Sequence, residues 1–255
     1  MTTPRASISF DRIADRYDET RGGEDRGRSI AADLHAHLRP DELVLDVGVG
    51  TGLVALGLRA LGHRVVGIDL SPAMLRQAWA RLGPVVAVAD AARLPIRSGA
   101  IAQAVSVWVL HLVGELPAVF GEVARVLAPG GRYLVVPANP ATGGDDISEL
   151  LRAMNQRLTS GRPHHSRDEL LAAAAAAGLE LVAAVAGTPD RYTRTPVSLA
   201  ELLETRTFSN LWHVSDSDWR TVVMPVIATL RARPDADQPH SIEVPRELII
   251  LERQA

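Results

Sequence analysis

Short apolar runs alternate with amphipathic segments over roughly residues 42–137. The runs are five to eight residues long and nearly free of charge, which is typical of strands buried on both faces of a parallel sheet. The segments between the runs have helical character, and this alternation predicts an α/β fold with helices on both faces of the sheet. The predicted strands are 43–47, 64–68, 85–89, 101–108 and 133–137.

Beyond residue 137 the pattern changes, and the residues from 139 to 146 are typical of a loop. Ser166 and Glu169 match a capping box at the start of an alanine-rich helix, and Gly178 ends that helix. The further elements predicted in this part of the chain are a helix over 147–158 and two strands over 179–186 and 244–251.

An insertion, residues 188–241, separates these last two strands. It is rich in aromatic residues, although aromatic residues make up only 4% of the chain. Ligands of open α/β sheets bind at the carboxyl ends of the strands, so the segment 202–213 is the candidate for a wall of a substrate site. For Phe208 and Trp219 we favour a place in the insertion's own small core.

Three glycines at alternate positions, Gly48, Gly50 and Gly52, follow the first strand and open a helix. Glycine lets the backbone turn sharply and lets a ligand lie against it, and the start of the helix presents unpaired N–H groups. Asp69 lies 21 positions after Gly48, at the end of the second strand, where a carboxylate can accept two hydrogen bonds from ribose hydroxyls. Together these residues predict a site for an adenosine-type cofactor.

The spacing of the glycines distinguishes between cofactors. A dinucleotide fingerprint is G-x-G-x-x-G, and the position of its third glycine holds Leu53 here. Asp46, just before the loop, would repel a pyrophosphate but suits a cation. Both observations disfavour a nicotinamide cofactor.

The stretch V-L-D-V-G-V-G-T-G resembles the cofactor loop of class I S-adenosylmethionine-dependent methyltransferases of the small-molecule, "methyltransferase 11" type. The resemblance covers roughly residues 40–137 and includes the segments at 67–75, 90–96 and 125–132. The opening F-D-R-I-A-D-R-Y-D at 10–18 is also similar to that of many small-molecule methyltransferases. Phe10 and Tyr17 share one helical face there, which either packs on the domain or folds over the cofactor.

For the fold, the resemblance implies a Rossmann-like, seven-stranded, mostly parallel sheet whose last two strands form an antiparallel edge pair. It also implies a helical cap over the carboxyl ends of the strands. The expected organisation is an N-terminal helical segment (1–40), a core (41–187 and 242–255) and a cap (188–241, with 138–165 contributing).

For the site, the resemblance implies S-adenosyl-L-methionine as the cofactor and gives each matched residue a part of it. The expected contacts are Gly48, Gly50 and Gly52 with the methionine part, Asp46 with its ammonium, Asp69 with the ribose, Leu70 and Met74 with the faces of adenine, Asp90 and Ala91 with its edge, Trp108 with the methyl donor, and Tyr17 and Arg21 with the methyl group or the carboxylate.

Methyl transfer from a sulfonium is an in-line displacement, and it needs a protein base only for some acceptors. His111 follows the fourth strand and is the leading candidate for a base, with packing against a helix as the alternative. Tyr17 is a second catalytic candidate, and His213 in the insertion is a weaker one. We expect no metal site, because neither His164-His165 nor Asp145-Asp146 is joined by further ligands at a suitable spacing.

Composition limits the remaining possibilities. The chain has no cysteine, a net charge of −3, no apolar stretch long enough to span a membrane and no apolar segment near residue 1. We therefore expect a cytoplasmic enzyme with a small-molecule methyl acceptor and without nucleic-acid or membrane partners. A nicotinamide-dependent oxidoreductase, a non-catalytic cofactor-binding protein and an RNA or protein acceptor remain alternatives, and the oligomeric state is open.

Overall fold

A computed structural model describes residues 5–20, 22–138, 145–158 and 165–254. Within them lies a seven-stranded sheet with the order β3-β2-β1-β4-β5-β7-β6. Strand β1 pairs parallel with β2 and with β4, β2 pairs parallel with β3, and β4 pairs parallel with β5. Strand β5 pairs antiparallel with β7, so the predicted Rossmann-like, mostly parallel sheet is confirmed. The strands are β1 (Leu43–Val47), β2 (Arg64–Asp69), β3 (Val86–Val88), β4 (Ile101–Val107), β5 (Leu127–Val136), β6 (Leu179–Arg194) and β7 (His240–Arg253).

Three strands, β5, β6 and β7, are clearly longer than the sequence predicts. Strand β5 begins at Leu127 rather than at 133, because the chain around Gly130 and Gly131 stays in the sheet as an irregularity of register. Gly130 has a φ of 69°, which lets the backbone bulge there without steric strain. Strands β6 and β7 are also longer than predicted, since their outer halves are rich in polar residues and lack an apolar run.

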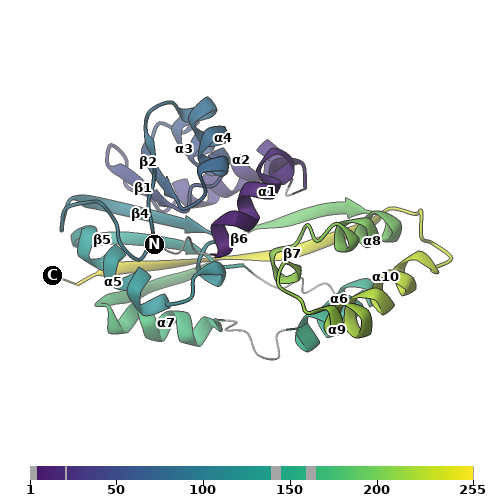
Figure 1. Cartoon of the computed structure of the whole chain (residues 1–255). Helices are drawn as coiled ribbons and strands as arrows, with labels where there is room; N and C mark the ends of the chain where they lie inside the picture. The colour runs from purple at the N-terminus through teal and green to yellow at the C-terminus, as the bar shows by residue number, and fades with distance from the viewer. Residues whose placement is uncertain (1–4, 21, 139–144, 159–164, 255) are drawn as a thin grey trace. The chain divides into compact units, whose positions relative to one another are not determined.

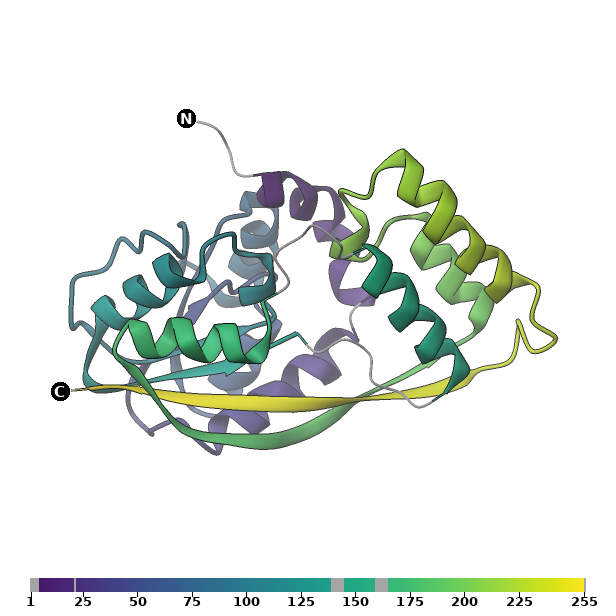
Figure 2. The same ribbon diagram turned by 90° about the horizontal axis from the view of Figure 1, so that it is seen from below.

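Helices cover both faces of the sheet (Figure 1). One core layer joins α2, α3 and α4 to the sheet through Ile30, Leu58 and Ala78. The other joins α5 and α7 to the opposite face through Phe120 and Leu170, and Figure 2 shows these two helices side by side. The helices are α1 (Arg5–Thr20), α2 (Gly23–His35), α3 (Leu53–Ala60), α4 (Pro72–Leu82), η1 (Leu110–Leu112), α5 (Leu116–Val126), α6 (Asp146–Leu158), α7 (Arg167–Ala176), α8 (Pro196–Glu204), η2 (Ser209–Leu211), α9 (Asp216–Asp218), η3 (Trp219–Val223) and α10 (Met224–Arg231).

Capping residues fix where the helices start. The hydroxyl of Ser166 accepts a hydrogen bond from the N–H of Glu169, and the Glu169 carboxylate accepts one from the N–H of Ser166, so the predicted capping box is present. Ser71 caps α4 in a similar way, because its hydroxyl accepts a hydrogen bond from the N–H of Met74 at 3.1 Å. This cap places the start of α4 directly after Asp69, beside the predicted cofactor site.

The chain divides into two compact units, a core unit (1–138, 165–188 and 246–255) and a second unit (139–164 and 189–245). The second unit has its own apolar core, in which Leu203 and Leu211 are buried and Phe208 and Trp219 are partly buried. The Arg206 guanidinium lies 4.1 Å from the centre of the Trp219 ring. The favoured place for Phe208 and Trp219, inside the insertion's own core, is therefore confirmed. A role of this unit as a cap over the strand ends stays a prediction.

Within the described residues, no helix is both long enough and apolar enough to span a membrane.

Candidate functional site

The glycine loop lies between β1 and α3, where the N–H groups of Gly48 and Val49 both donate to the carbonyl of Ile68 at 2.8 and 2.9 Å. Gly48 has a φ of 84°, and a Cβ built on it would lie 2.2 Å from a methyl carbon of Val109. Gly50, with a φ of 56°, faces open space within 4 Å. The loop is therefore shaped for a close ligand on the side of Gly50, and only glycine fits at position 48.

Asp69 is held between the loop and the start of α4. One carboxylate oxygen accepts from the N–H of Gly50 at 2.9 Å, and the other accepts from the N–H of Ser71 at 2.8 Å. Burial raises the pKa of Asp69, and these backbone hydrogen bonds oppose that rise. Each oxygen has a further lone pair, so the carboxylate can accept two more hydrogen bonds from neighbouring hydroxyl groups.

Asp46 is the most unusual group of the site. It is 2% exposed and lines a cavity beside the glycine loop, and in the described part of the chain no hydrogen-bond donor reaches its carboxylate. Burial raises the pKa of Asp46 to about 7, and the nearby negative charge of Asp69 adds to the rise. A buried carboxylate in this position is stabilised in its charged form only when a cation or donor joins it.

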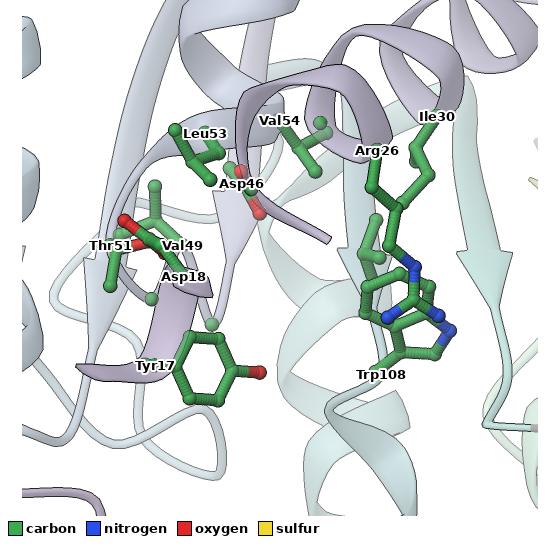
Figure 3. A pocket seen from close by; sticks show the side chains of 15 residues that line it. Tyr17, Asp18, Arg26, Ile30, Asp46, Val49, Thr51, Leu53, Val54 and Trp108 are labelled. Atoms are coloured by element: carbon green, nitrogen blue, oxygen red, sulfur yellow. The ribbon is translucent and has the colours of Figure 1, made fainter. Parts of the chain in front are cut away.

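Two cavities meet at the loop and share Tyr17, Gly48, Gly50, Val107 and Trp108 as lining residues. The larger, of about 340 Å³, extends past Asp69 and Met74, and its volume falls in the range of small-molecule sites. The smaller, of about 80 Å³, extends past Asp46 and is shown in Figure 3. The arrangement suits an elongated ligand with a large end beside Asp69 and a small, positively charged end beside Asp46.

Helix α1 forms a wall of both cavities and is attached by acidic side chains. Asp11 accepts hydrogen bonds from the Ser71 hydroxyl at 2.6 Å and from the N–H of Ala73 at 3.0 Å. Asp18 accepts from the Thr51 hydroxyl at 2.6 Å and pairs with Arg81 at the same distance. These bonds join α1 to the glycine loop and to α4, so the helix positions Tyr17 against the ligand site.

We expect Asp18→Ala to weaken binding of a ligand in these cavities by about tenfold, because one loop anchor of α1 is lost at a cost of about 1–1.5 kcal/mol. Asp15→Ala is the matched control, since Asp15 lies on the same helix and its contact, a 3.2 Å hydrogen bond from Gln77, is on the surface. Isothermal titration measures both variants. Equal effects of the two substitutions would contradict a specific role of the Asp18 anchor.

The remaining wall of the smaller cavity comes from α2 and the end of β4. Gly27 lets α2 approach α3 closely, because a Cβ there would lie 2.9 Å from the Cβ of Leu53. This approach brings the Arg26 guanidinium to 3.5 Å from the centre of the Trp108 ring. Trp108 has a φ of 53°, and for a bulky residue this left-handed conformation costs about 1–2 kcal/mol. Backbone strain of this kind concentrates at functional sites.

Comparison with known proteins agrees with this geometry. Residues 45–135 match the family model described as "Methyltransferase domain". The ubiquinone/menaquinone biosynthesis C-methyltransferase UbiE of Syntrophotalea carbinolica is 37% identical over 150 residues, which are 53% of this chain and 63% of that protein. The malonyl-[acyl-carrier protein] O-methyltransferase of Geobacter sulfurreducens is 35% identical over 149 residues, 54% of this chain and 56% of that protein. Residues 45–135 form a methyltransferase domain.

The chain thus spans less than two thirds of the length of these relatives. Among solved structures, the [4+2]-cyclase SpnF superposes with a TM-score of 0.63 at 19% identity, covering 100% of this chain and 97% of that one. At this identity the likeness concerns the fold of the methyltransferase domain and leaves its substrate open.

The fold brings most of the predicted site residues to the two cavities. Those that line one or both cavities are Tyr17, Asp46, Gly48, Gly50, Asp69, Leu70, Met74, Asp90, Ala91 and Trp108. Gly52 lines neither: it caps α3 with a φ of 85°, and a Cβ on it would meet Leu82 and Ala78 of α4 at 3.0 and 3.2 Å. Position 52 therefore requires glycine because α3 and α4 pack closely there.

Three other predicted residues do not join this set. His111 lies exposed in η1 and is absent from the lining of either cavity. His213 is exposed in the second unit, and Arg21 lies outside the described residues. The smaller cavity is also lined by Arg26. The sequence reasoning missed this residue, because an arginine in a charged helical segment carries no signal of its own. Among the described residues no cluster of three or more potential metal ligands occurs.

Proposed function

We propose that this chain binds S-adenosylmethionine and transfers its methyl group to a small-molecule acceptor. The observation that carries the proposal is the buried Asp46 carboxylate beside a glycine loop, because its charged form is stabilised there by a cation. A pyrophosphate there would be repelled, and the nicotinamide alternative has no support from the family. The ammonium group of the cofactor's methionine part supplies the missing cation.

The residues present fit the rest of this cofactor. The free lone pairs of Asp69 suit the two ribose hydroxyls, and the apolar side chain of Met74 with Leu70 suits the face of an adenine. Asp90 and Ala91 line the same cavity and suit its edge. Gly50 leaves open space where the methionine part passes the loop.

When bound, the cofactor supplies a methyl group on a positively charged sulfur. The chain's own residues then have two tasks, to hold the acceptor in line and to exclude water. Tyr17 and Trp108 line both cavities at their junction, so they flank the space where transfer takes place. Tyr17 is further held by an edge-on contact with Phe10, whose ring centre lies 6.1 Å away.

Isothermal titration with S-adenosylmethionine, S-adenosylhomocysteine and NAD tests the cofactor. We expect micromolar binding of the first two to the wild type and none of NAD. In Asp69→Ala the affinity should fall at least about 100-fold, because two hydrogen bonds to a charged acceptor are lost. Thermal unfolding of the variant confirms that it is folded. Binding of NAD in place of the sulfonium pair would overturn the proposal.

The acceptor is proposed at the level of a small molecule. The relatives' names include a C-methyltransferase and an O-methyltransferase, so neither name fixes the atom methylated here. A net charge of −3 and the absence of cysteine support a cytoplasmic protein that acts without nucleic acid. Formation of S-adenosylhomocysteine over a panel of candidate acceptors distinguishes an enzyme from a non-catalytic binder.

A further inference from the structure

We propose that Asp33 is a positioning residue for the methionine part of the cofactor. It acts through helix α2, because it fixes the rotation of that helix about its own axis against strands β6 and β7. The inference rests on the proposed binding of S-adenosylmethionine, and it adds to that function a residue that lines neither cavity.

The carboxylate of Asp33 is held by both strands. Its Oδ1 accepts a hydrogen bond from the Thr188 hydroxyl at 2.8 Å, and its Oδ2 accepts one from the Thr188 N–H at 2.9 Å. Oδ2 also pairs with the Arg246 guanidinium at 2.6 Å, and the same guanidinium nitrogen donates to the Ser29 hydroxyl of α2 at 3.2 Å. The side chains of Arg246 and Asp33 are 2% and 13% exposed, so salt and water screen the pair little. These four residues form a clamp on α2.

The sheet is shaped to receive this carboxylate. On β6, Val185 packs against the apolar core that α2 shares, and the next position on the same face is Gly187. A Cβ built on Gly187 would lie 2.6 Å from Oδ2 of Asp33, so glycine leaves the room that the clamp needs. On β7, Leu248 belongs to the same core, and Arg246 lies two positions before it. The apolar face of the sheet therefore ends at the clamp.

Asp33 lies on the stripe of α2 that reaches the smaller cavity. Residues Arg26, Ser29, Ile30 and Asp33 are spaced i, i+3, i+4 and i+7, so they share one side of the helix. Arg26 and Ile30 line the cavity beside the glycine loop, where the methionine part is proposed to bind. Ser29 and Asp33 attach the same stripe to the strands. A rotation of α2 would therefore move the cavity wall.

The other contacts of α2 set its distance from its neighbours. A Cβ on Gly57 of α3 would lie 2.6 Å from the Cβ of Ala31, so α2 and α3 approach each other at small residues. Burial of apolar side chains such as Leu34 is non-directional. Hydrogen bonds to a carboxylate are directional, and those with a charged partner are the stronger ones. The clamp thus supplies the directional restraint on the helix.

Titration with two ligands tests the proposal, S-adenosylhomocysteine and 5′-methylthioadenosine, which lacks the amino acid part. In Asp33→Ala the affinity for S-adenosylhomocysteine should fall at least about tenfold, because the wall at its amino acid part is displaced. The affinity for 5′-methylthioadenosine should change less than about threefold. Asp25→Ala is the matched control, since Asp25 lies on the same helix and its ion pair with Arg28 is on the surface.

Two further variants separate position from stability and charge. Gly187→Ala keeps every charged group and displaces the Asp33 carboxylate, so it should show the same selective loss, and it decides the test if Asp33→Ala does not fold. Asp33→Asn keeps the shape, because its oxygen can accept from the N–H of Thr188 while its amide donates to the Thr188 hydroxyl. Both Asp33 variants lose the negative charge beside the buried Arg246, so both should unfold at lower urea concentration. Only Asp33→Ala should lose S-adenosylhomocysteine affinity.

Three results would overturn the proposal. Equal losses of affinity for the two ligands in the alanine variants would mean that the clamp only stabilises the fold. Unchanged affinity for S-adenosylhomocysteine in a folded Gly187→Ala would mean that the position of the carboxylate is irrelevant. A selective loss in Asp33→Asn as large as in Asp33→Ala would assign the effect to charge. Absence of S-adenosylhomocysteine binding in the wild type would instead refute the proposed function.

Discussion

Replacing Asp46 with asparagine is expected to stabilise the ligand-free protein at pH 8 and to remove most of its affinity for the cofactor. The pKa of Asp46 is about 7 in the folded chain, above its ordinary value of 3.8. The folded state therefore binds the proton more tightly than the unfolded state, and wild-type stability falls as pH rises from about 4 to 7. A difference of about three pKa units corresponds to about 4 kcal/mol.

The measurement is urea denaturation of wild type and Asp46→Asn from pH 4 to pH 8. The stability advantage of the variant should be near zero at pH 4 and grow to about 4 kcal/mol at pH 8. Exposed Asp15→Asn is the control for the change in net charge. An advantage that stays constant over this range would contradict a buried, proton-binding Asp46.

The same residue makes cofactor binding depend on pH in the opposite sense. An ammonium pairs with the ionised carboxylate, so the affinity of the wild type should fall about tenfold for each pH unit below 7. Asp46→Asn should show weak binding without this dependence. The stability of the ligand-free protein thus favours the protonated form of Asp46, whereas cofactor binding favours the ionised form. Such a conflict between stability and function is common at functional sites.

Gly48→Ala is expected to have the other large effect. Its Cβ would lie 2.2 Å from a methyl carbon of Val109, and the residue would keep a φ of 84°. Overpacking and a left-handed alanine together should lower the free energy of unfolding by about 2–4 kcal/mol. Because Val109 lines the larger cavity, moving it should also weaken S-adenosylhomocysteine binding more than tenfold.

Gly62→Ala is the matched control for Gly48→Ala. Gly62 has a φ of 93° and faces open space within 4 Å, and it lies outside the lining of both cavities. In this variant, backbone strain alone should lower the free energy of unfolding by about 1–2 kcal/mol, and the affinity for S-adenosylhomocysteine should be unchanged. Calorimetry and titration measure both variants, and an equal loss of affinity in the two would show that the contact with Val109 is irrelevant.

The sequence predicts best the elements that are defined by local pattern. The apolar run at Leu43–Val47, interrupted only by Asp46, gives β1 with its observed bounds, and the capping box at Ser166 gives the start of α7. The outer halves of β6 and β7 were missed because they carry no apolar run. Pairing between residues far apart in the sequence forms these strands.

The site shows the same division. The glycine loop and the acidic residues Asp46 and Asp69 were predictable because they lie in or directly after the first two strands. Ten of the predicted contact residues line the cavities. The packing role of Gly52 depends on Ala78 in another helix. The left-handed backbone of Trp108 and the position of Arg26 depend on three separate elements, and no local pattern reports such a contact.

The way in which α1 is attached has a consequence for the kinetics of the cofactor. The helix is held to the core by the carboxylates of Asp11 and Asp18 and by a small apolar cluster around Ala14 and Met74. These contacts can break while both layers of the main core stay intact. We therefore expect cofactor exchange to require local opening of α1, at a rate set by how often the helix detaches. Amide hydrogen exchange in α1 and product release should therefore slow or accelerate together.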